Sequence, residues 1–172
     1  MDNTISTKMK TDAMHALKEN TANRLREERA LDKAPNCIQL ILDHALYFPE
    51  EGGIVIFAAL VNPTEQAEQV TGATIKITDP DGEFPAISMP STIAVPEIPV
   101  WCSEFPVRIA ADEALIGQMF FQTDDGKSLV DWQEAVKRHG PFRAIVHFVT
   151  LKSGTLTREC RVMDVRHYRS IG

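Results

Sequence analysis

The sequence has no apolar run long enough to cross a membrane. Its longest uninterrupted apolar stretch is Ile54–Val61, whereas an apolar membrane helix needs about 20 residues. The first 31 residues are polar throughout and lack the apolar segment of a secretory signal. The sequence therefore predicts no membrane span, no membrane partner and no export.

Cysteine is scarce, with only Cys37, Cys102 and Cys160 in 172 residues. An odd number of cysteines without a CxxC spacing is not a disulfide framework, and it fits a reducing compartment. We therefore expect a cytoplasmic protein. A structural zinc site is not expected either, because no CxxC or HExxH spacing supports one.

Catalytic signatures are also missing. The chain contains no glycine-rich phosphate-binding pattern, no GxSxG nucleophile turn and no HExxH zinc motif. We therefore expect no catalytic residues, no cofactor and no enzymatic activity.

The net charge of -6 conceals a strong asymmetry along the chain. Residues 37–136 carry three basic and sixteen acidic groups, whereas residues 137–172 carry eight basic and two acidic groups. A general nucleic-acid binder would carry a net basic domain, so we expect no nucleic-acid partner. The basic C-terminal strands either neutralise acidic neighbours across the sheet or form a patch that docks an acidic partner.

Residues 6–31 contain good helix formers and neither glycine nor proline, which predicts a helix. Its apolar stripe is interrupted by Thr21 and Asn23, so a solvated tail is the preferred interpretation. An oligomerisation or partner-binding helix is the alternative. The break at residues 33–36 predicts an N-terminal extension over residues 1–36, dispensable for folding, and a domain over 37–166 followed by a tail over 167–172.

Short apolar or alternating segments separated by Pro, Gly, Asn and Asp fill residues 37–165, as is typical of an antiparallel sandwich or barrel. The proline-rich region from Pro85 to Pro106 is expected to be edge strand and irregular crossing. Ser128 is a good N-cap for a short helix that Gly140 ends. The expected strands are Cys37–Leu46, Ile54–Val61, Ala73–Thr78, Val107–Ile109, Leu115–Gln122, Phe142–Leu151 and Leu156–Val165.

About seven strands, with a short helix before the final hairpin, resemble the immunoglobulin-like β-sandwich superfold. The resemblance implies an all-β, antiparallel Greek-key sandwich and implies no activity. The Cys-Trp-Cys spacing of true immunoglobulin domains is absent.

Alternation within the first strand predicts that Leu42, His44 and Leu46 share its apolar face. A turn at Ser153-Gly154 predicts a final hairpin in which His147 lies opposite Cys160. That pair is interpreted as structural, because no further ligand or base lies at a supporting spacing.

Four aspartates in turns, at positions that could share one end of a sandwich, are weak candidates for a calcium site. Turns favour aspartate in any case, so we expect no bound metal. The candidates are Asp79, Asp81, Asp124 and Asp125.

The function indicated by these observations is a non-catalytic protein-protein interaction module with an unknown partner. Its docking residues are expected to be Trp101, in the proline-rich segment, and Arg158 and Arg161, which have opposite parity on the basic last strand. One alternative is a small ligand- or metal-binding sandwich, including an enzyme, with the acidic turns as its site. Another is a homo-oligomer organised by the N-terminal helix.

Overall fold

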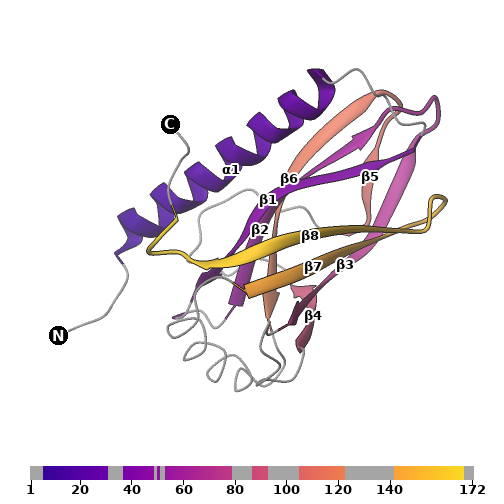
Figure 1. Cartoon of the computed structure of the whole chain (residues 1–172). Helices are drawn as coiled ribbons and strands as arrows, with labels where there is room; N and C mark the ends of the chain where they lie inside the picture. Colours follow the sequence, from indigo (N-terminus) through magenta and orange to yellow (C-terminus); the bar gives the residue numbers. More distant parts are fainter. Residues whose placement is uncertain are drawn as a thin grey trace.

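The computed structural model describes residues 6–30, 37–48, 50, 53–78, 87–92, 105–122 and 142–168. One helix and eight strands occupy these residues (Figure 1). They are α1 (Thr7–Ala30), β1 (Gln39–Phe48), β2 (Gly53–Asn62), β3 (Glu68–Thr78), β4 (Ile87–Thr92), β5 (Val107–Ile109), β6 (Glu113–Gln122), β7 (Phe142–Thr150) and β8 (Thr155–Asp164).

The strands form one mixed sheet in the order β4-β6-β2-β1-β8-β7-β3-β5. β4 also pairs with β3, which brings the two ends of the sheet together, so seven strands form a nearly closed barrel. The short strand β5 pairs with the same edge of β3 as β4 does. The expected immunoglobulin-like Greek-key sandwich of two antiparallel sheets is therefore wrong.

The correction has a physical reason. An alternating pattern shows which face of a strand is buried, but it is the same in a sandwich and in a closed sheet. Here the first strand and the last strand pair in parallel, through Ala45–Val162 to Tyr47–Asp164. β4, which contains Pro90, divides its pairing: Ile87–Pro90 pair with β3, whereas Ser91 and Thr92 pair with β6.

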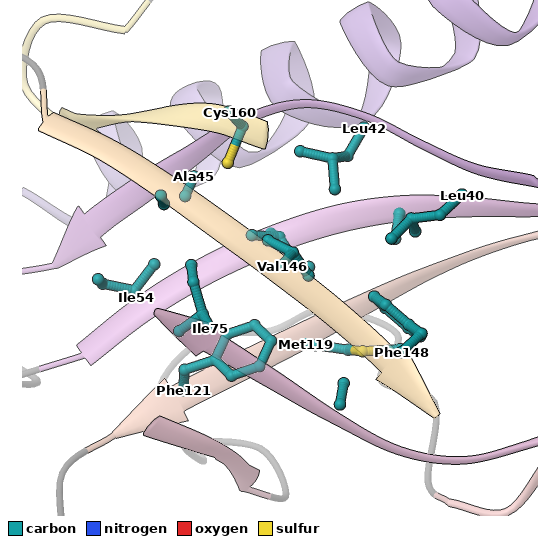
Figure 2. Packing of buried hydrophobic residues seen from close by; sticks show 14 of the residues in the cluster. Leu40, Leu42, Ala45, Ile54, Ile75, Met119, Phe121, Val146, Phe148 and Cys160 are labelled. Atoms are coloured by element: carbon teal, nitrogen blue, oxygen red, sulfur yellow. The ribbon is translucent and has the colours of Figure 1, made fainter. Parts of the chain in front are cut away.

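The inner cluster fills the space that the curved sheet encloses (Figure 2). Alternate residues of every long strand contribute to it, as an inward-facing period of two requires. Its members include Leu42 and Ala45 of β1, Ile56 of β2, Ile75 of β3, Phe121 of β6, Phe148 of β7 and Cys160 of β8.

Helix α1 covers the outer face of β1 and β2. Ser6 caps its first turn, because the hydroxyl oxygen of Ser6 accepts a hydrogen bond from the backbone N–H of Met9. Leu17 of α1 is fully buried and belongs to a second cluster with Phe48 of β1 and Phe57 of β2. The expected helix is confirmed, and the interpretation of it as a solvated tail is wrong. Every residue of β2 is buried because one face lies in the inner cluster and the other lies under α1.

A bulge interrupts β1 at Asp43 and His44. The register with β2 shifts between Leu42 and Ala45, and an extra residue reverses which parity faces inward. Leu42 consequently lies in the inner cluster, whereas Leu46 lies on the outer face under α1. The expectation that the two leucines share one face is therefore wrong.

The final hairpin is confirmed, but its predicted register is wrong. His147 lies opposite Thr157, and Cys160 lies opposite Ala144. The turn is longer than a two-residue turn at Ser153-Gly154, and Gly154 adopts a positive φ of 80°. Three residues, 151–153, separate the paired residues Thr150 and Gly154, and the length of this loop sets the register.

Several expectations concern residues outside the described ranges. These are the helix from Ser128, Trp101, and the four aspartates Asp79, Asp81, Asp124 and Asp125. Among the described residues, no helix combines the length and the apolar character that crossing a membrane requires.

Candidate functional site at the open edge of the last strand

β1 and β8 part after a short stretch of pairing. Both are ten-residue strands, yet the ladder between them joins only three residue pairs, from Ala45–Val162 to Tyr47–Asp164. The two strands lie together near the end of β1 and diverge toward the hairpin of β7 and β8 (Figure 1). The β1 bulge lies where they separate, which accounts for the change in direction of β1.

The first half of β8 therefore has an open backbone edge. The backbone N–H of Thr150 donates to the carbonyl of Gly154 over 2.9 Å, which makes this residue pair the hydrogen-bonded end of the hairpin. Hydrogen-bonded and non-hydrogen-bonded pairs alternate along an antiparallel ladder. Thr155, Thr157 and Glu159 thus direct their N–H and C=O groups away from β7. No strand in the described part of the chain pairs with these three residues on that side.

Apolar side chains and one charged side chain flank the open edge. Leu156 and Cys160 pack with the inner cluster, and Arg158 has the same parity as they do. Since β1 has parted from β8 here, the Arg158 guanidinium reaches α1, where its Nη2 donates to a Glu28 carboxylate oxygen at 2.8 Å. Arg158 is half-buried as a result.

Arg161 lies on the outer face of the sheet and is exposed. Arg143 of β7 lies directly opposite Arg161 and forms an ion pair with Glu159. No described residue forms an ion pair with Arg161. The two predicted docking arginines of β8 therefore differ: Arg158 is held by the helix, and Arg161 is a free cation within the described residues.

A cluster of buried polar groups lies at the β1 bulge, where β1 and β8 separate. The side chain of Asp43 is buried, with the residue 4% exposed. Its Oδ1 lies 2.7 Å from Nε of Arg24 and 3.0 Å from Nδ1 of His44. Its Oδ2 accepts a hydrogen bond from the Tyr168 hydroxyl, which in turn accepts one from Nδ2 of Asn20 at 2.6 Å. The cluster joins α1, the bulge and the C-terminal segment.

Electrostatics favour ionised Asp43. Burial alone would raise the pKa of its carboxyl, but the nearby His44 ring, the hydrogen bond from Tyr168 and the charge of Arg24 lower that pKa to about 2. The same arrangement raises the pKa of the Tyr168 hydroxyl, chiefly through burial and then through its bond to Asp43. The cluster therefore holds a carboxylate and a neutral phenol at neutral pH.

The arrangement contains no activated cysteine. Burial raises the pKa of the Cys160 thiol to about 12, so the thiolate that nucleophilic chemistry needs is absent at neutral pH. No three metal-ligating residues gather into a cluster in the described ranges. The Asp43 cluster links the helix to the sheet, and the open edge of β8 has backbone hydrogen-bonding groups next to two arginines.

Sequence reasoning missed both the bulge and the role of Tyr168. The available signal was Asp43-His44, two polar residues in succession within a strand that is otherwise mostly apolar. Such a pair predicts a break in the alternation. Tyr168 lies in the segment expected to be a tail, and nothing in its neighbours indicates that it is buried.

Comparisons with known proteins give no family. No protein-family model matches the sequence, and no curated protein matches it. Solved structures show weak similarity. The alkylpurine DNA glycosylase AlkC from Pseudomonas fluorescens, bound to DNA containing an abasic site analogue, is 14% identical with a TM-score of 0.37, over 87% of this chain and 37% of that chain.

Two further structures are similar to the same degree. A protein from Archaeoglobus fulgidus is 13% identical with a TM-score of 0.36, over 63% of this chain and 82% of that chain. The sporulation control protein Spo0M from Bacillus subtilis is 10% identical with a TM-score of 0.36, over 74% of this chain and 48% of that chain. This chain thus spans little more than a third of the glycosylase and about half of Spo0M. Similarity at this level assigns neither a family nor an activity.

Proposed function

We propose that this protein is a non-catalytic interaction module that binds an extended segment of a partner protein along the open edge of β8. The observation that carries the proposal is that no strand of the described residues pairs with the outer edge of Thr155, Thr157 and Glu159, where β1 has separated from β8. Addition of a strand to a free sheet edge is a common mode of peptide recognition.

The chemistry of the edge supports a specific partner over indiscriminate association. Open strand edges are prone to pair with any exposed strand, and charged side chains beside the edge suppress such pairing. Glu28 and Arg158 place opposite charges there, and Arg161 adds a further cation on the outer face. A partner segment therefore has to match these charges as well as the backbone.

The cytoplasmic location expected from the sequence belongs to the same proposal. Cys37 is exposed and Cys160 is buried, and both are free thiols. An exposed free thiol is compatible with a reducing compartment. A protonated Cys160 beside the ionised Asp43 also supports a role without nucleophilic catalysis.

Selection of random twelve-residue peptides displayed on phage, against the full-length protein, tests the proposal. Enriched peptides are then synthesised and titrated against Thr157→Pro and Thr157→Val. Proline removes the backbone N–H that points to the open edge, whereas valine keeps it. Both variants lose the contact between the Thr157 hydroxyl and His147, so the pair isolates the backbone donor.

The expected result is that peptides bind the wild-type protein and Thr157→Val with similar affinity. They should bind Thr157→Pro at least about tenfold more weakly, because proline removes one backbone hydrogen bond to the peptide and changes the shape of the strand edge. Circular dichroism confirms that the variants are folded. Failure to enrich any peptide, or equal binding by the proline variant, would contradict the proposal. A dimer that the proline variant abolishes would instead identify a second copy as the occupant of the edge.

A further inference from the structure

Helix α1 places its own carboxylate on the cation beside the open edge. Glu28 lies in the last two turns of α1 and bonds to Arg158 of β8, 130 residues away in sequence. The side chains of Glu28 and Arg158 are 30% and 38% exposed. Because both groups remain partly hydrated, a competing carboxylate has access to Arg158.

The rest of α1 is fixed by other contacts. Leu17 is buried in the cluster with Phe57, and Arg24 binds Asp43 at 2.7 Å. Loss of the bond between Glu28 and Arg158 would therefore leave the helix on the sheet. The Glu28 side chain can move aside without unfolding the helix.

We infer that the segment bound by the β8 edge carries an acidic residue that displaces Glu28 from Arg158, so that α1 competes with the partner for this cation. The inference rests on the proposed function and names the chemistry of its partner. A carboxylate is what a guanidinium binds most tightly among protein side chains, and a partner that brings one replaces the bond that α1 gives up.

The alternating side chains of β8 also predict the residue pattern of the partner segment. Leu156 and Cys160 stand two residues before and after Arg158 and pack with the inner cluster. A strand paired along this edge presents its alternate residues to the same three positions. The segment is therefore expected to have an acidic residue flanked, two positions away on each side, by apolar residues. Its intervening residues face Thr157 and Glu159 and are expected to be polar and not acidic.

Peptides from the selection that lose binding to Thr157→Pro are the probes for this inference. Each is compared with a copy whose acidic residue is replaced by its amide, against the wild-type protein, Glu28→Gln and Arg158→Gln. The matched control is Glu27→Gln, which removes the same charge from the neighbouring, exposed position of α1.

The expected result is that Glu28→Gln binds the acidic peptide about two- to fivefold more tightly than the wild-type protein, the range given by a partly exposed ion pair. Glu27→Gln binds as the wild type does. Arg158→Gln binds more weakly and no longer distinguishes the acidic peptide from its amide copy.

Two outcomes overturn the inference in different ways. If edge-binding peptides exist but their acidic residue and Glu28→Gln make no difference, the competition is absent while the proposed function stands. If no peptide depends on the backbone N–H of Thr157, both statements fail together. Unchanged far-ultraviolet circular dichroism in the Glu28 and Glu27 variants shows that α1 is intact in each measurement.

Discussion

The interface between β1 and β8, called the seam here, has a closed half and an open half that differ in strand pairing and in the burial of their polar groups. In the closed half, three residue pairs form a ladder, and the buried Asp43 binds Arg24, His44 and Tyr168 beside it. In the open half, one partly exposed ion pair between Glu28 and Arg158 spans the gap. The difference teaches that a single bulge divides one seam into a part that holds the fold together and a part whose backbone edge is open within the described residues.

Removal of residues 1–33 should have the largest effect. Without α1, the outer face that contains Leu46, Phe48 and Phe57 would be exposed to water, and loss of Leu17 alone should cost about 3 kcal/mol. We expect the truncated protein to lose cooperative unfolding or to aggregate, as measured by urea titration and light scattering. A truncated protein with a normal unfolding midpoint would show that the closed half does not need the helix.

Replacement of Asp43 by alanine should have the next largest effect. It leaves the buried Tyr168 hydroxyl without its acceptor, whereas the Arg24 side chain is 42% exposed and can be hydrated. Loss of a buried acceptor costs about 2 kcal/mol. Urea unfolding measures the loss. Asp12→Ala, which removes an exposed carboxylate from α1, is the control and should change the unfolding free energy by less than about 0.5 kcal/mol.

The closed half should also be sensitive to acid. The pKa of Asp43 is about 2 in the folded protein, whereas the ordinary value for an aspartate, which applies to the unfolded chain, is 3.8. A depressed pKa stabilises the folded state fully above pH 3.8, and this stabilisation is lost as the pH falls from about 4 to 2. The contribution is about 2 kcal/mol.

The measurement is the unfolding free energy of the wild-type protein and of Asp43→Asn at several pH values between 2 and 6. The difference between them should shrink as the pH falls through this window. A constant difference would mean that Asp43 does not carry the acid sensitivity. Asp164 and Glu68 also have lowered pKa values and remain in both proteins, so their effects cancel.

The open half should respond least. Glu28→Gln removes a partly exposed ion pair, and such pairs contribute about 0.5 kcal/mol or less to stability. Its thermal midpoint should lie within about two degrees of the wild-type value. A loss as large as that of Asp43→Ala would place Glu28 and Arg158 in the structural half of the seam and remove the contrast between the halves.

Much of the local structure could be predicted from the sequence. The alternating and apolar segments identified the long strands, and the helix over residues 6–31 is observed as α1. The pairing of the strands could not be predicted, because the contact between the first and last strands joins Ala45 to Val162, and no local pattern encodes so distant a partner.

Less of the candidate site could be predicted. Arg158 and Arg161 were identified by their charge and opposite parity, and they lie on different sides of the strand. The open edge itself depends on the bulge at Asp43 and His44, which reverses the alternation that sequence reasoning assumed to be continuous. The contact between Glu28 and Arg158 depends in turn on α1 packing against the sheet.

The bond between Asn20 and Tyr168 has a consequence for synthesis of the protein on the ribosome. Asn20 is translated well before its partner, which follows 148 positions later. β1 likewise waits for β8 before its second edge is paired. Closure of the seam therefore waits until β8 has left the ribosome. Contacts between such distant positions slow folding and leave apolar strands exposed in the meantime. Nascent chains that end before residue 160 should thus bind chaperones, and full-length chains should be released from them.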